Sequence, residues 1–172
     1  MLQIDLGALR NGPVDMEQAV PTDDPCFSDL DVQLAEPVRL SGRLMEAGSG
    51  CFFWHGSLHT QVMGFCRRCL EPVEVVVDQQ LDVLFTEDQD ADDPSAYVIP
   101  HRAAELDPGE AVREELILAV PDYVLCDPEC RGLCPDCGTN FNESSCNCEN
   151  NESDPRWAVL EALKLGQPHE RT

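Results

Sequence analysis

The stretch Cys66-Arg-Arg-Cys69-Leu-Glu-Pro72 joins two strand-like segments, and together these three parts decide the fold. Residues 51–65 are rich in apolar and aromatic side chains, and in residues 73–85 apolar side chains alternate with polar ones. Alternation with a period of two is typical of a strand that buries one face. Two such strands joined by a short link predict an antiparallel sheet or a barrel-like meander.

Shorter segments with the same alternation precede this pair, at residues 2–6, 30–34 and 38–40. Pro37 separates the last two segments, which predicts an edge strand or a bulge between two strands. Residues 14–25 are mixed in character, and Pro21, Asp23, Asp24 and Pro25 mark a loop at their end.

Two short helices are expected in the second half of the chain. The pair Asp107-Pro108 has the order of a capping residue followed by proline, which predicts a helix over residues 109–120. The pair Asp154-Pro155 repeats this order before a short apolar face that ends near Gly166. The fold class is therefore α+β.

The chain divides into three predicted parts. Residues 1–121 form a mainly antiparallel β-rich, barrel-like domain with one helix, which includes an acidic loop at residues 86–108. Residues 122–150 form a small cysteine module with too few apolar residues for a core, so metal must stabilise it. Residues 151–172 form the second helix and a tail.

Ten cysteines narrow the chemistry most, because eight of them fall in close pairs with the spacing of zinc ligands. The predicted ligands are Cys66, Cys69, Cys126, Cys130, Cys134, Cys137, Cys146 and Cys148. Four thiolates saturate a zinc ion, so one or two structural zinc ions are expected rather than a catalytic one. Cys26 and Cys51 stand alone and are expected to be apolar fillers.

Spacing favours one division of the ligands without fixing it. Cys134 and Cys137 form a knuckle that Cys146 and Cys148 can close, which leaves the other four thiols for a second site. A different division, with Cys130 joining the knuckle, stays open. A redox pair at Cys66 and Cys69 is a further alternative, since two adjacent arginines would lower the pKa of a thiol.

The charge excludes broad contact with nucleic acid. Acidic residues number 33 against 11 basic ones, for a formal net charge of -22, and phosphates would be repelled across most of the surface. This excess fits either a basic protein partner or adaptation to a salty habitat. The sequence shows neither a membrane-spanning run nor a secretory signal, so we expect a cytoplasmic bacterial protein.

Several blocks, taken in order, resemble one family. They are Cys66-Arg-Arg-Cys-Leu-Glu-Pro-Val73, Glu114-Glu-Leu-Ile-Leu-Ala-Val-Pro121, Cys130-Arg-Gly-Leu-Cys-Pro-Asp-Cys-Gly-Thr-Asn-Phe-Asn142 with Cys146-Asn-Cys148, and Asp154-Pro-Arg-Trp-Ala-Val-Leu160. This order resembles that of the YceD family, the large ribosomal RNA subunit accumulation proteins of bacteria and plastids. The resemblance covers about residues 65–164.

The resemblance implies a non-enzymatic factor in ribosome biogenesis that supports 23S rRNA accumulation or processing and large-subunit assembly. The implied partners are components of large-subunit precursors, namely a ribosomal protein, a processing factor or rRNA, with neither a membrane nor a small-molecule substrate. The candidate contacts are Arg67, Arg68, Arg131 and Arg156, because guanidinium groups suit phosphate oxygens. The alternative function is a zinc- or thiol-dependent enzyme, either a hydrolase or a redox protein.

Overall fold

The computed structural model describes residues 2–89 and 93–148. Its elements in chain order, with η for a 3-10 helix, are β1 (Ile4–Asp5), η1 (Leu6–Asn11), β2 (Val14–Val20), η2 (Pro25–Phe27), β3 (Gln33–Leu34), β4 (Val38–Gly48), β5 (Cys51–Phe65), β6 (Pro72–Thr86), β7 (Tyr97–Val98), β8 (Glu105–Leu106) and α1 (Gly109–Ala119). The helix predicted after residue 154 lies outside the described residues.

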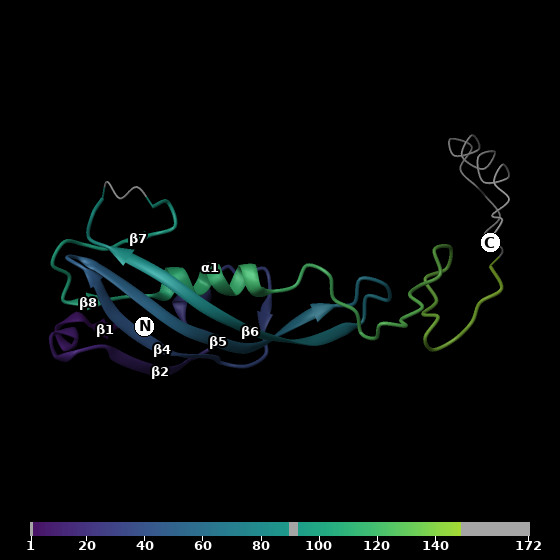
Figure 1. The fold of residues 1–172 in the computed structure, drawn as a ribbon. Coiled ribbons are helices and arrows are strands. Elements are labelled where there is room, and N and C mark those ends of the chain that lie inside the picture. Colours follow the sequence, from purple (N-terminus) through teal and green to yellow (C-terminus); the bar gives the residue numbers. More distant parts are fainter. Residues whose placement is uncertain (1, 90–92, 149–172) are drawn as a thin grey trace, which may run out of the picture. The chain divides into compact units, whose positions relative to one another are not determined.

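One mainly antiparallel sheet contains most of the strands, in the order β2-β4-β5-β6-β7 (Figure 1). Strand β3 pairs with β5 beyond the end of β4, so the predicted interruption near Pro37 is confirmed. Of the strand pairings that the structure describes, only the short one between β6 and β7 is parallel. Among the described residues β2, β7 and most of the outer side of β6 have no further partner strand, so the antiparallel sheet is confirmed and the expectation of a barrel-like closure is wrong.

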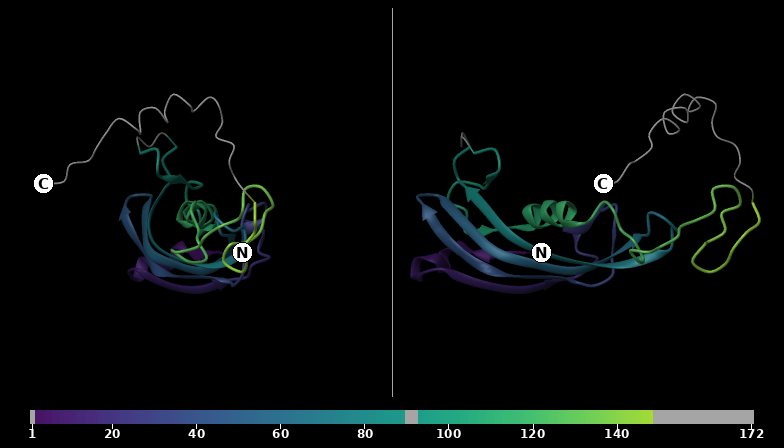
Figure 2. Two further views of the ribbon diagram at one scale, coloured as in Figure 1. Left: turned by 90° about the vertical axis from the view of Figure 1, so that its right-hand side faces the viewer. Right: turned by 45° about the vertical axis from the view of Figure 1, so that its right-hand side comes forward.

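The sheet curves around α1, and the core lies between them (Figure 2). On each central strand every second side chain points inward, as the period-two pattern requires. The fully buried inward side chains of these strands include Val38, Leu40, Leu44, Trp54, Leu58, Val62, Leu81 and Phe85. From α1, Val112 and Leu116 are buried against this face, and each such side chain contributes about 1.5–3 kcal/mol when it leaves water.

The buried indole of Trp54 requires small residues at the sheet positions that it covers. Gly42 on β4 and Gly56 on β5 are paired in register, and both lie under the indole. A Cβ at Gly42 would lie 2.5 Å from Trp54 Nε1 and 2.6 Å from Gly56 Cα. The glycines therefore provide the space for Trp54, the largest fully buried side chain among the described residues.

The sequence-based expectations fail mainly in the N-terminal part. The expected loop is confirmed at residues 21–24, but the sequence does not predict the strand before them: Val14–Val20 form edge strand β2, paired with β4 along its whole length. Its inward positions include Gln18, a polar residue that hides the alternation. The strand expected over residues 2–6 is shorter, because Asp5 caps the 3-10 helix η1 by accepting from the Gly7 N–H.

Strands β5 and β6 and helix α1 agree with their predicted spans, and residues 66–71 form the expected tight link. Contacts between backbone positions divide the chain into two compact units, Met1–Cys130 and Arg131–Thr172. The three-part division predicted from the sequence stays a prediction. The described residues include no helix with the length and hydropathy needed to cross a bilayer.

Replacing Gly42 with alanine should lower the free energy of unfolding by about 1–3 kcal/mol, since the methyl group forces Trp54 or the β5 backbone to move. Urea unfolding followed by far-UV circular dichroism measures this change. Gly64→Ala on β5 is the matched control, because its Cβ would meet only ordinary contacts at 3.5 Å or more. Equal effects of the two substitutions would contradict this account of the Trp54 pocket.

Candidate metal centres

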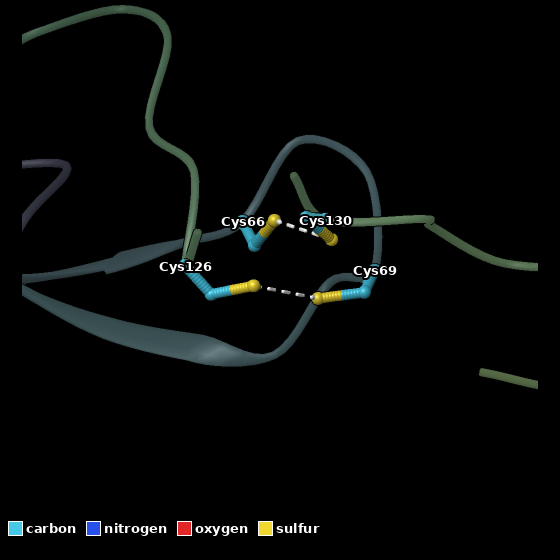
Figure 3. Close-up of side chains that lie close together, drawn as sticks. All are labelled: Cys66, Cys69, Cys126 and Cys130. Carbon is cyan, nitrogen blue, oxygen red and sulfur yellow. Dashed lines mark hydrogen bonds between the residues drawn. The ribbon is translucent and has the colours of Figure 1, made fainter. Parts of the chain in front are cut away.

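The first cysteine cluster comprises Cys66, Cys69, Cys126 and Cys130 (Figure 3). Cys66 and Cys69 lie in the turn between β5 and β6, and the other two follow α1. The cluster thus joins segments that are far apart in the sequence. All four sulfur atoms lie within 4.8 Å of one another, and only Cys126 is exposed.

The sulfur spacing fits a metal ion rather than a disulfide. The Sγ atoms of Cys66 and Cys130 are 3.8 Å apart, and those of Cys69 and Cys126 are 3.5 Å apart. A disulfide needs about 2.05 Å, whereas sulfurs about 2.3 Å from a central ion in a tetrahedron are about 3.8 Å apart. The cluster can therefore hold one ion with four sulfur ligands.

The turn that carries Cys66 and Cys69 is closed by backbone hydrogen bonds. The Cys66 N–H donates to Glu71 O at 2.8 Å, and the Leu70 N–H donates to Cys66 O at 2.9 Å. This path requires a φ of 62° at Leu70, in the left-handed region that side chains with a Cβ avoid. The leucine is 63% exposed, so burial does not offset this strain.

Arg67 and Arg68 hold the chain after α1 beside this turn. The Arg67 backbone N–H donates to Val124 O at 2.8 Å, and its Nε donates to Asp122 O at 2.9 Å. The Arg68 guanidinium donates to the carbonyls of Pro128 and Cys130, at 3.1 and 2.8 Å. The structure thus gives both arginines a part in positioning Cys126 and Cys130, and their contact with an external partner stays a prediction.

The second cysteine cluster comprises Cys134, Cys137, Cys146 and Cys148, again with all sulfur atoms within 4.8 Å. Its first pair repeats the backbone pattern of the first cluster. The Cys134 N–H donates to Thr139 O and the Gly138 N–H donates to Cys134 O, both at 2.9 Å. At the position equivalent to Leu70, Gly138 has a φ of 72°, which costs glycine little.

Hydrogen bonds favour the thiolate at one position in each cluster. Although burial raises the pKa of Cys66, backbone N–H groups of Cys126, Cys69 and Arg68 lower it to about 6. The hydroxyl and backbone N–H of Thr139 lower the pKa of Cys137 to about 6. The thiolate is the form that binds metal.

The crowded sulfur atoms oppose further ionisation. Cys69 and Cys130 raise the pKa of Cys126 to about 12, and Cys137 and Cys146 raise that of Cys148 to about 12. A cation at the centre of each cluster would offset this repulsion between sulfur atoms. The arrangement therefore has the electrostatics of a cation site.

The other candidate residues are not members of the two clusters. Cys51 is half-buried with its sulfur 3.6 Å from the Thr86 hydroxyl, and burial raises the pKa of half-buried Cys26 to about 12. Arg131 is exposed and its backbone N–H donates to Asn142 Oδ1 at 2.8 Å. Arg156 lies outside the described residues. Sequence reasoning missed the Thr139 hydroxyl, because threonine after a cysteine pair carries no distinctive signal.

Leu70→Gly should raise the free energy of unfolding by about 1 kcal/mol, because glycine adopts the left-handed conformation without a Cβ clash. Leu70→Ala is the matched control: it removes the same exposed side chain and keeps the strained backbone. Urea unfolding of the metal-loaded chain measures both. A gain for alanine as large as that for glycine would show that the side chain, rather than the backbone, is responsible.

Comparison with known proteins connects this architecture to a family. The profile described as "Large ribosomal RNA subunit accumulation protein YceD" matches residues 54–164. An uncharacterized protein of Mycobacterium tuberculosis is 31% identical over 111 residues, covering 61% of this chain and 52% of that protein. The chloroplastic "Large ribosomal RNA subunit accumulation protein YCED homolog 1" of Zea mays is 27% identical over 176 residues, covering 84% of this chain and 55% of that protein.

The match to a further relative spans most of both chains. The uncharacterized protein YlbN of Bacillus subtilis is 23% identical over 152 residues, covering 87% of both chains. The chain spans only about half the length of the mycobacterial and maize relatives that it matches. No solved structure matches it significantly. Because the family profile covers well over half of its residues, the chain belongs to the YceD family.

Proposed function

We propose that this protein is a non-enzymatic factor of large-subunit ribosome biogenesis that supports the accumulation of 23S rRNA. The family description, which names accumulation of the large ribosomal subunit RNA, supports the process. The observation that carries the mode of action is the pair of closed four-sulfur clusters. These clusters suit a scaffold that binds other molecules, rather than an active site.

Zinc is the ion that this proposal assigns to both clusters. Four cysteine thiolates in a tetrahedron form a usual structural zinc site, and the cysteine spacing departs from the usual iron–sulfur run. An ion with four sulfur ligands keeps no position for water or substrate. Zinc would therefore stabilise the fold, and at these positions it could not act as a Lewis acid on a substrate.

The first cluster would fix the chain after α1 to one end of the sheet. It joins the β5–β6 turn to the segment after α1, and α1 packs against the inner face of β6. The second cluster would organise residues 131–148, in which few side chains are buried. Thiols that bind zinc must stay reduced, which fits the cytoplasm that we propose as the compartment.

The net charge of -22 favours a basic partner among the components of large-subunit precursors. An acidic surface attracts positively charged ribosomal proteins, and it repels bare rRNA except at local cations. Arg131 is the exposed cation that is best placed for such a test, because its side chain lies outside the hydrogen bonds that hold the first cluster. Binding, rather than chemistry on a small molecule, is therefore the proposed activity.

The purified chain should contain about two zinc ions. Cys66→Ser should reduce this to about one, and Cys51→Ser is the control that should keep both. A chelator should empty the second cluster first, because Cys137 and Cys148 are exposed whereas three ligands of the first are buried. Zinc release followed with a colorimetric indicator gives the count and both rates; bound iron, or a single zinc in the wild type, would contradict the assignment.

In bacterial extracts the tagged wild-type chain should co-sediment with large-subunit precursors, and a strain lacking its own family member should regain 23S rRNA relative to 16S rRNA when the chain is expressed. Arg131→Glu should reduce co-sedimentation. Arg10→Glu, which reverses an exposed arginine on η1, is the matched control. A wild-type chain that neither co-sediments nor changes the rRNA ratio would refute the proposed function.

A further inference from the structure

Strand β6 has a long backbone edge that faces away from β5. Strand β5 covers the other side of β6 from Pro72 to Thr86. On the free side, β7 pairs only with Phe85 and Thr86. Within residues 2–89 and 93–148 no other strand pairs with this side, so the edge from residue 74 to residue 84 is open.

Hydrogen bonds at the end of β6 show which backbone groups point outward. Thr86 O accepts from the Ile99 N–H at 2.8 Å, on the β7 side, whereas the Glu87 N–H donates back to Gly50 O beside β5. Because the direction alternates along an antiparallel strand, the even-numbered residues 74–84 present their N–H and C=O groups to the free edge. In agreement, the Gln80 carbonyl accepts from the Gln79 side chain instead of from a strand.

Helix α1 lies beside the β7 end of this edge and carries exposed apolar side chains. A strand paired with the outer side of β6 can reach α1. Tyr97 of β7 does so, because its hydroxyl donates to the Glu114 carboxylate of α1 at 2.5 Å. One turn further along the helix, Ile117 and Leu118 are 48% and 79% exposed. An extended segment placed on the open edge after β7 would cover these two side chains with its inward residues.

The solvent face of the edge is acidic. The even-numbered residues of β6 include Glu74, Asp78 and Asp82, all exposed. The Asp78 carboxylate lies 3.8 Å from His59 Nδ1 of β5. The Asp82 carboxylate lies 2.6 Å from His55 Nδ1 of the same strand. Glu74 has no ion pair among the described residues. Side chains directly across a strand pair are about 5 Å apart, so an added strand would place its outward residues beside these carboxylates.

We propose that the open edge of β6 binds an extended basic segment of a protein partner, which adds to the sheet as a further strand. Its backbone pairs with residues 74–84, its alternate lysine or arginine side chains lie beside Glu74, Asp78 and Asp82, and its apolar side chains cover Ile117 and Leu118. This inference rests on the proposed function, in which the partner is a basic component of large-subunit precursors.

A protein segment fits this edge better than RNA does. Strand addition uses alternating backbone donors and acceptors, which a peptide supplies at the same spacing. Nucleic acid offers no such ladder, and its phosphates would face three carboxylates. The acidic residues also discourage self-association of the edge, as charged residues on edge strands generally do. The edge is thus selective for a basic peptide.

The test uses the full zinc-loaded chain and a ten-residue peptide in which lysine and valine alternate. Amide exchange by NMR should show protection of Glu74, Val76, Asp78, Gln80, Asp82 and Leu84 in the wild type on binding. Gln80→Pro removes an outward N–H without removing a bond to β5 and should weaken binding at least about tenfold. Gln80→Ala keeps the N–H and is the matched control.

A peptide of the same composition with its lysines and valines in two blocks separates strand addition from attraction to an acidic chain. Equal binding of the two peptides, equal binding to the proline and alanine variants, or protection elsewhere would overturn the inference. If Gln80→Pro fails to fold, amide protection in the wild type is the test: protection of the even-numbered residues 74–84 supports the inference, and its absence contradicts it. If the peptide tests fail but the wild-type chain still co-sediments with large-subunit precursors, the β6 edge is excluded as the binding site. The proposed function is then unaffected.

Discussion

Contact among four sulfur atoms is the constraint on which the first compact unit depends. The β5–β6 turn supplies Cys66 and Cys69, and the chain after α1 supplies Cys126 and Cys130. The same region carries the Arg67 and Arg68 hydrogen bonds to backbone carbonyls. Since α1 packs on β6, an ion bound by these four sulfur atoms would link the end of this hairpin to the chain that follows the helix.

The two cysteine turns show how one local geometry is built from different residues. Both use a hydrogen bond from the first cysteine to the residue five positions later, and both require a positive φ one residue after the second cysteine. Glycine meets that requirement at position 138, whereas Leu70 meets it with strain. Strain of this kind persists only where surrounding contacts fix the backbone, as the hydrogen bonds of Arg67 and Arg68 do here.

Much of this architecture could be predicted from the sequence, because long buried strands have a clear period. Strands β5 and β6 and helix α1 follow from alternation, capping and proline positions. Strand β2 could not, since Gln18 occupies an inward position on a partly covered edge, and β7 and β8 are too short to show any period. Spacing favours the grouping of Cys66 and Cys69 with Cys126 and Cys130 without fixing it. The structure brings these four together, through contacts such as that of the Arg67 N–H with Val124 O, which spacing does not show.

The central claim is that two ions are each enclosed by four sulfur ligands and serve the fold. X-ray absorption at the zinc edge on the purified chain tests it most directly. The account predicts four sulfur neighbours per zinc at about 2.3 Å and no lighter ligand. Nitrogen or oxygen in the first coordination shell, as at a catalytic zinc with bound water, would contradict it.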